Sequence, residues 1–323
     1  MNQNLSIAMA TFNGEPFIAE QLASIINQSI PPNEIIICDD SRNEFTFNAI
    51  APFMTIHPDL IKYHYNDKQL GVSKNFEKAI SLTTGDIILL SDQDDVWKLN
   101  KIEKLIALLN STPHCNGTFC NSELVDRNLI SLNVTHWSLR GFRGNKGSLC
   151  SSDNMLDFFL KRVPAAGHNM VFNAKLKNIL LPFPDLIECH DTWIGLIIAT
   201  ISRWSFIDDT LTKFRQHSDN VSEIGRHSKL KEAIASIKND TFTWHLSLYN
   251  ELIERLSQSD YHIEAKVTNL LTDRRNHSAA RDKMNCNILK RLPHILAEIK
   301  NKRYFKYGRG WKSVIQDLLL RRL

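Results

Sequence analysis

The chain has 323 residues, of which 43% are hydrophobic and 23% are charged, and its formal net charge is +4. This composition is typical of a globular protein with one large or two ordinary domains. No apolar run approaches the roughly 18 residues that cross a bilayer, the N-terminus lacks a secretion-signal pattern, and the six scattered cysteines do not resemble a disulfide framework. We therefore expect a cytoplasmic protein without a membrane-spanning helix.

Short apolar runs alternate with helical periodicity over the first hundred residues. Runs bounded by turn residues predict strands at 5–12, 34–40, 61–66 and 86–92. Apolar residues at helical spacing predict helices after Pro16, from Ser73 to Leu82 and from about Trp97 to Leu109. Strands that alternate with such helices form right-handed βαβ units around a parallel sheet that is buried on both faces. The predicted fold class is therefore α/β.

Acidic side chains follow two of these strands at the point where each strand ends. Asp39 and Asp40 end the second strand, and Asp92, Asp94 and Asp95 follow the run IILL. Ligands of open α/β sheets bind beyond the carboxyl ends of the strands. Clustered carboxylates are stable there if they hold a hard cation, such as Mg²⁺ or Mn²⁺, together with a phosphate group. The ordinary alternative is that these acids are turn and capping residues.

Three common motifs are absent from the sequence. The chain lacks the glycine-rich phosphate-binding motifs GxxxxGK[ST] and GxGxxG, and it lacks the nucleophile motif GxSxG. A hydrolase with a nucleophile elbow is therefore not expected. A metal ion held by residues 92–95 is the expected substitute for a glycine-rich phosphate-binding loop.

The pattern is looser between residues 153 and 220. An amphipathic helix is predicted at MLDFFLKRV, and a short strand follows the turn at Gly167. His190 and Asp191 lie at the N-terminal end of a second predicted helix, and a strand then leads to His217. After Ser222 glycine is nearly absent and leucine and isoleucine recur at helical spacing, which predicts a separate helical region.

Positive charge is concentrated at the C-terminal end. Residues 290–323 contain ten Lys and Arg but only two acids, a net charge of +8, which leaves −4 on residues 1–289. Aromatic residues are interleaved with basic ones in KRYFKYGRGW (302–311). Such a segment suits an anionic partner, either a membrane surface or a nucleic acid. The alternative is that its aromatic residues pack against the rest of the chain.

Seven segments resemble the family-2 glycosyltransferases in the same order: ATFNGE, ICDDS, GVSKNFEKA, GDIILLSDQDDVW, GHNMVFN, HDTW and FRQHSDNVS. SDQDDVW, and RQH followed by NV, are similar to the bacterial rhamnosyltransferase branch of that family. The resemblance covers residues 5–222. It implies a GT-A fold, a Rossmann-like nucleotide-binding domain with a mixed sheet flanked by helices. We therefore expect a GT-A domain at 1–222 and a helical, basic C-terminal region at 223–323.

The resemblance also implies roles by position. Asp191 would be the catalytic base, with His190 where many members have Glu. Mg²⁺ or Mn²⁺ would be held by Asp92, Asp94, Asp95 and His217. The nucleotide-sugar would lie against Thr11, Asn13, Glu15, Asp39, Asp40, Lys74, Asn75, Asp92 and Gln93.

The function implied is inverting, metal-dependent transfer of a sugar from a nucleotide-sugar donor to a hydroxyl of a cell-surface glycan precursor of O-antigen or capsule type. L-rhamnose from dTDP-L-rhamnose is the expected donor sugar, with a UDP-hexose or another dTDP-deoxysugar as the alternative. A non-catalytic sugar-nucleotide or glycan-binding protein is the alternative of another class. If the acceptor is lipid-linked, the basic C-terminus favours peripheral contact with the inner face of the cytoplasmic membrane. We then expect no nucleic-acid partner.

Overall fold

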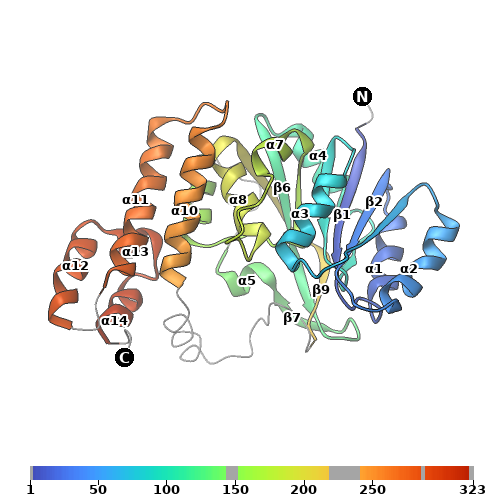
Figure 1. Ribbon diagram of the computed structural model, residues 1–323, viewed down its shortest axis with the longest axis horizontal. Helices are drawn as coiled ribbons and strands as arrows, with labels where there is room; N and C mark the ends of the chain where they lie inside the picture. Colours follow the sequence, from blue (N-terminus) through green and yellow to red (C-terminus); the bar gives the residue numbers. More distant parts are fainter. Residues whose placement is uncertain (1–2, 143–151, 218–240, 285–287, 320–323) are drawn as a thin grey trace. The chain divides into compact units, whose positions relative to one another are not determined.

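The computed structural model describes residues 3–142, 152–217, 241–284 and 288–319. The chain divides into two compact units, Met1–Ile224 and Gly225–Leu323, each of which is described by itself (Figure 1).

The N-terminal unit is built on one mixed sheet. Within the described ranges it has nine strands in the order β3-β2-β1-β4-β8-β6-β9-β5, and β7 pairs with β6 outside this path. The strands are β1 (Leu5–Thr11), β2 (Glu34–Asp39), β3 (Ile61–Tyr65), β4 (Ile87–Ser91), β5 (Val96–Trp97), β6 (Cys115–Val125), β7 (Ser131–Thr135), β8 (Met170–Asn173) and β9 (Arg203–Arg215). The predicted α/β class is confirmed.

Helices flank this sheet on both faces. They are α1 (Ile18–Ile26), α2 (Phe45–Ile56), α3 (Val72–Leu82), α4 (Lys101–Ser111), α5 (His136–Arg140), α6 (Ser152–Lys161), α7 (Lys177–Leu180) and α8 (His190–Ile201), with the short 3₁₀ helices η1 (Gly167–Asn169) and η2 (Ala174–Leu176). One hydrophobic cluster joins α1, α2 and α4 to one face of β1, β2 and β4. Helix α3 packs on β1 and β2 but contributes nothing to that cluster, so it covers the other face.

The first four strands of the order, β3, β2, β1 and β4, are parallel to one another. Their carboxyl ends therefore meet at one edge, as the sequence predicts. Strand β8 then pairs antiparallel with β4, with Leu89 opposite Val171. This reversal brings the beginning of β8 beside the end of β4.

One predicted boundary is wrong. The helix expected from about Trp97 begins instead at Lys101. Val96 and Trp97 form β5, which pairs antiparallel with residues 212–213 of β9. The pairing of β5 with a distant strand overrides the local helical pattern.

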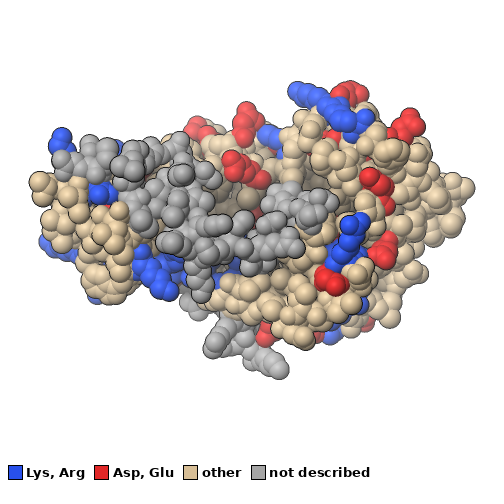
Figure 2. All heavy atoms as spheres, turned by 90° about the horizontal axis from the view of Figure 1, so that it is seen from below, with Lys and Arg blue, Asp and Glu red and all other residues tan. Residues whose placement is uncertain are grey.

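The C-terminal unit is helical in its described residues. Its helices are α10 (Thr241–Ser257), α11 (Ala265–Asp282), α12 (Ile288–Lys300), α13 (Arg303–Tyr307) and α14 (Trp311–Leu319). A small apolar cluster contains Ile295, Tyr304 and Val314. On the face drawn in Figure 2, the coloured side chains over this unit are mainly Lys and Arg.

Buried polar contacts join the helices of this unit beside its apolar cluster. The guanidinium of Arg281 donates two hydrogen bonds of 2.7 Å to the carboxylate of Asp317, which is fully buried. His277 Nδ1 lies 2.5 Å from the buried carboxylate of Glu298. Breaking the Arg281–Asp317 pair by removing one partner would leave an uncompensated buried charge.

Candidate active site

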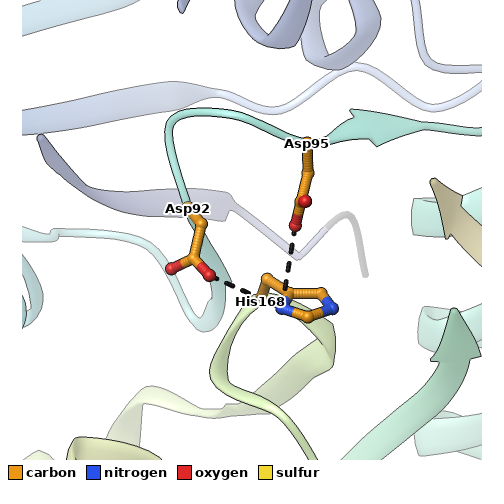
Figure 3. Close-up of side chains that lie close together, drawn as sticks. All are labelled: Asp92, Asp95 and His168. Atoms are coloured by element: carbon orange, nitrogen blue, oxygen red, sulfur yellow. Dashed lines mark ion pairs between the residues drawn. The ribbon is translucent and has the colours of Figure 1, made fainter. Parts of the chain in front are cut away.

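Two acids and a histidine converge at the carboxyl edge of the sheet (Figure 3). Asp92 and Asp95 lie between β4 and β5, and His168 lies on η1, immediately before β8. His168 Nδ1 is 3.5 Å from Asp92 Oδ2 and 3.6 Å from Asp95 Oδ2. One ligand atom of each residue lies within 4.8 Å of the others. We call these three residues the acid–histidine cluster.

The electrostatics of the acid–histidine cluster fit a divalent cation. Asp95 is fully buried, and its Oδ2 has no hydrogen-bond partner, whereas Oδ1 accepts a bond of 3.1 Å from the N–H of Arg215. Burial, together with the charges of Asp94 and Asp92, raises the pKa of Asp95 well above its ordinary value. Burial and Lys101 lower the pKa of His168 to about 3, so its imidazole is neutral. A neutral imidazole can ligate a metal. Lys101 offsets part of the charge of Asp92 and Asp95, but Asp95 Oδ2 is left without a donor, and a metal would supply that contact.

Lys101 lies beneath the acid–histidine cluster and holds η1 in place. Its buried Nζ donates to the carbonyl oxygen of His168 at 2.7 Å and to Thr212 Oγ1 at 2.9 Å. It also lies 3.8 Å from the ring centroid of Trp97. Burial lowers the pKa of Lys101 to about 8. The two hydrogen bonds of its Nζ connect α4 to η1 and to β9.

Asp94 and His217, also predicted as metal ligands, form a separate pair. His217 Nε2 lies 2.9 Å from Asp94 Oδ2, and the His217 ring packs against Phe17 with 4.6 Å between centroids. Arg215 Nε donates to the carbonyl oxygen of Asp94 at 2.8 Å, and the same guanidinium pairs with Glu20. The structure thus brings Asp92 and Asp95 together with His168, and Asp94 together with His217.

Asp39 and Asp40 are buried and hydrogen-bonded within the fold. Asp39 Oδ1 accepts from the N–H and the hydroxyl of Ser41, and Oδ2 accepts from Tyr63 Oη at 2.6 Å. Asp40 Oδ1 accepts from Asn66 and from the N–H of Leu70, and Oδ2 accepts from the N–H of Gly71. Asp40 therefore fixes the loop that leads into α3.

Asn75, Thr11 and Gln93 brace the ends of β1 and β2. Asn75 Nδ2 donates to the carbonyl oxygens of Cys38 and Thr11, at 2.9 and 3.2 Å. Gln93 Oε1 accepts from the N–H of Phe12 at 2.8 Å, and Gln93 Nε2 donates to the carbonyl oxygen of Phe12 at 3.0 Å. These contacts hold the loop after β1 against the loop that carries the acids.

Two further predicted residues lie on the loop after β1. The N–H of Asn13 donates to Ser41 Oγ at 2.8 Å, and Asn13 has a φ of 50°. Glu15 Oε2 accepts from Thr46 Oγ1 at 3.4 Å. This loop is thereby tied to the end of β2 and the beginning of α2.

Lys74 reaches the segment that precedes α8. Its Nζ donates to the carbonyl oxygen of Phe183 at 2.6 Å and pairs with Glu77 and Asp185 at 3.0 Å. Lys74 also lines an open groove of about 1030 Å³ between α3 and residues 177–182. No member of the acid–histidine cluster lines that groove.

Asp191 is the second residue of α8 and is half-buried. The N-cap of this helix is Cys189, whose side chain makes no capping hydrogen bond. The partial positive charge of a helix N-terminus stabilises a carboxylate there. The charge of Asp191 opposes the lowering of the pKa of His168, which indicates that Asp191 lies near the acid–histidine cluster.

His190 is the first residue of α8. It is buried, stacks on Phe76 with 3.9 Å between ring centroids, and its Nε2 has no hydrogen-bond partner. Burial lowers the pKa of His190, while the charges of Asp191 and Asp92 oppose that shift. A Cβ at Gly167 would lie 2.2 Å from His190 Nε2, so only glycine allows η1 to approach α8 this closely.

Sequence reasoning missed His168, Lys101 and Arg215 as site residues. His168 belongs to the segment GHNMVFN, which was recognised as part of the family pattern without a role for this histidine. The available signal was that His168 lies between the predicted turn at Gly167 and the strand that follows it. The direction of β8, which places it beside the acids, is a property of the tertiary fold.

Comparisons with known proteins agree with this geometry. Residues 6–158 match the model of the family Glycosyl transferase family 2. The chain is 32% identical over 238 residues to the dTDP-rhamnosyl transferase RfbG of Shigella flexneri, which covers 69% of this chain and 75% of that protein. It is 26% identical over 126 residues to the UDP-Glc:alpha-D-GlcNAc-diphosphoundecaprenol beta-1,3-glucosyltransferase WfgD of Escherichia coli, which covers 39% of this chain and 48% of that protein.

The structural comparison shows the same fold. The mannosyltransferase PcManGT from Pyrobaculum calidifontis, solved in complex with GDP-Man and Mn²⁺, matches with a TM-score of 0.56 at 14% identity, covering 98% of this chain and 86% of that one. The mixed sheet flanked by helices therefore has the GT-A fold. The chain belongs to glycosyltransferase family 2, and both the predicted family and the predicted fold are confirmed.

Proposed function

We propose that this glycosyltransferase moves L-rhamnose from dTDP-L-rhamnose to a hydroxyl of a cell-surface glycan precursor, with inversion at the anomeric carbon. The observation that carries the proposal is the acid–histidine cluster beside Asp191, because this reaction needs a diphosphate-binding site and a base in one cleft. The donor is supported by the similarity to RfbG, whose name gives a dTDP-rhamnosyl transferase.

Asp92, Asp95 and His168 would hold Mg²⁺ or Mn²⁺ when the enzyme is loaded. A divalent cation supplies the positive charge that stabilises a departing diphosphate. The fit is supported by the orphaned Oδ2 of Asp95 and by the neutral imidazole of His168. Asp94 and His217 are proposed to contribute from the adjacent pair, on the side of Phe17.

The nucleotide is proposed to lie over the ends of β1 and β2. Asp39 or Asp40 would accept a hydrogen bond from the pyrimidine N3–H. Thr11 at the end of β1, and Asn13 and Glu15 on the loop after it, would contact the nucleotide. Gln93 holds this loop in position. Lys74 and Asn75 are proposed to line the same side of the cleft, with Lys74 at its outer end.

Asp191 is proposed as the general base. Its carboxylate takes the proton of the acceptor hydroxyl while that oxygen bonds to the anomeric carbon and the bond from this carbon to the diphosphate breaks. Attack from the face opposite the diphosphate inverts the anomeric centre. A single carboxylate is sufficient, because no protein nucleophile is needed for inversion.

The acceptor is proposed to be a lipid-linked saccharide of O-antigen or capsule type. WfgD supports this class, because its name gives a diphosphoundecaprenol-linked acceptor. No helix in the described part of the chain is long and apolar enough to cross a membrane. We therefore propose a peripheral location on the inner face of the cytoplasmic membrane, reached through the basic C-terminal region.

Calorimetry tests the donor without knowledge of the acceptor. We expect dTDP to bind more tightly than UDP or GDP in Mn²⁺, and EDTA to abolish most of this affinity. A preference for UDP would keep the enzyme class and replace rhamnose with a hexose, the alternative that the similarity to WfgD favours. Absence of nucleotide binding in the presence of metal would contradict the proposed site.

A further inference from the structure

The surface of residues 288–319 contains no exposed acid. Glu298 is buried and accepts hydrogen bonds from His277 and Arg303. Asp317 is buried and accepts from Arg281 and Tyr304. Both acids of this segment are therefore used inside the C-terminal unit, and the exposed charges of residues 288–319 are all positive.

The exposed cations of this segment lie on or between all three of its helices. They are Lys290, Lys300, Lys302, Lys306, Arg309 and Lys312. Figure 2 shows blue side chains of this kind over the C-terminal helices. Lys306 Nζ lies 3.8 Å from the carboxylate of Asp273 on α11. At that distance on the surface the pair contributes little, so the field of the segment stays positive.

Large apolar side chains are exposed among these cations. On α12 they follow one face at Leu289, Leu292 and Leu296, of which Leu289 is 77% exposed. On α14 they recur every fourth residue at Trp311, Ile315 and Leu319, with exposures of 61%, 51% and 72%. Buried residues of the same helices, such as Ile295 and Val314, face the interior of the unit. Both helices are therefore amphipathic, with an exposed apolar stripe.

We propose that residues 288–319 form a docking surface for an anionic lipid bilayer. The apolar side chains of α12 and α14 enter the boundary between headgroups and acyl chains, and the surrounding Lys and Arg bind lipid phosphate. This inference deepens the proposed function by identifying the residues that meet the membrane. It rests on that function only for the expectation that a bilayer carries the acceptor.

Charge complementarity favours this partner over two others. A second copy of the chain docked through the same surface would bring two sets of cations together without an acid between them. A nucleic acid would pair with the cations but leave the leucines and isoleucines in water, because only the aromatic side chains stack on bases. An anionic bilayer satisfies both the charged and the apolar side chains.

The test is co-sedimentation of the full-length protein with vesicles of phosphatidylcholine alone or mixed with phosphatidylglycerol. Each Lys near an anionic surface is worth about fivefold in partitioning, so neutralising three should lower binding by on the order of 100-fold. The charge variant carries K300Q, K302Q and K312Q. The apolar variant carries L289S, L296S and W311S, and we expect at least a tenfold loss from it.

Matched controls use residues of equal exposure outside the segment. Ile56 and Leu99 are 71% and 65% exposed on the N-terminal unit, and I56S/L99S should leave vesicle binding unchanged. Lys283 is exposed on the C-terminal unit, and K283Q should lower vesicle binding by less than the roughly fivefold expected for each lysine of the charge variant. Circular dichroism confirms that each variant is folded, and nucleotide calorimetry on the same variants reports the active site separately.

Loss of binding to mixed vesicles in both variants, with unchanged nucleotide affinity, supports the proposal. Equal binding to the two vesicle types, or variants that sediment like the unchanged protein, would overturn it. A shift from dimer to monomer in light scattering without any vesicle binding would assign the surface to a second copy instead. Failure of nucleotide binding with intact vesicle binding would contradict the proposed function alone.

Discussion

Replacing Asp95 with Asn should stabilise the protein in EDTA and weaken its affinity for metal. The ligand oxygens of Asp92 and Asp95 lie within 4.8 Å of each other. Two unit charges at that separation repel by about 3 kcal/mol at an effective dielectric constant of about 20. The Asp92 side chain is 36% exposed, and solvent screening reduces the net gain to about 1–2 kcal/mol. An Asn carbonyl still accepts the hydrogen bond from the N–H of Arg215.

Asp39 provides the matched control. It is as fully buried as Asp95, but its two oxygens accept three hydrogen bonds, two from Ser41 and one from Tyr63. Asp39→Asn places a donor where an acceptor is needed and should cost about 1–3 kcal/mol. The two buried Asp→Asn changes should therefore shift stability in opposite directions.

Thermal unfolding in EDTA, followed by circular dichroism, measures both changes. A gain of about 1–2 kcal/mol should raise the Tm of Asp95→Asn by roughly 2–6 °C. Because the pKa of Asp95 is raised in the folded protein, its favourable contribution is complete below its ordinary value of 3.8 and is lost as pH rises through the raised value. The advantage of Asp95→Asn should therefore grow from acid toward neutral pH. An unchanged or lower Tm at neutral pH would refute this reasoning.

Three further changes address other parts of the structure. Asp191→Asn should lower transfer by about 10²–10⁴-fold while dTDP affinity in calorimetry stays unchanged, and near-normal turnover would remove Asp191 as the base. His168→Ala should lower Mn²⁺ affinity by about 10–100-fold. If this variant loses as much nucleotide affinity in EDTA as it does in Mn²⁺, a metal role for His168 is excluded. Arg281→Met leaves Asp317 buried without its cation and should lower the free energy of unfolding by about 3–5 kcal/mol in urea titrations, whereas adding Asp317→Leu should restore most of it.

The parallel half of the fold could be predicted because its strands have local signals. Strands β1, β2 and β4 are buried on both faces and have continuous apolar runs, so their ends were predicted to within a residue or two. The acids after β4 lie at the predicted edge for the same reason. The position of Asp92 beside Asp95 follows from chain connectivity alone.

The second half of the sheet could not be predicted in this way. The long strand β6 has the sequence CNGTFCNSELV, whose glycine and polar residues resemble a loop, yet most of it is buried. Its polar side chains are satisfied by distant partners, for example Asn121, which donates to Asp208 Oδ1 and accepts from the N–H of Trp137. His168 enters the site only because β8 runs antiparallel to β4. Pairing over such distances leaves no local periodicity in the sequence.

The acid–histidine cluster has a consequence for how the enzyme is made. Its acids and Lys101 belong to the first half of the chain, whereas His168, and Thr212 to which Lys101 also donates, belong to the second. A nascent chain that has emerged only as far as α4 contains Asp92 and Asp95 but not His168. The chain between Asp95 and His168 must still close into a loop, which costs conformational entropy. The proposed metal site is therefore complete only late in synthesis, after β8 and β9 have joined the sheet.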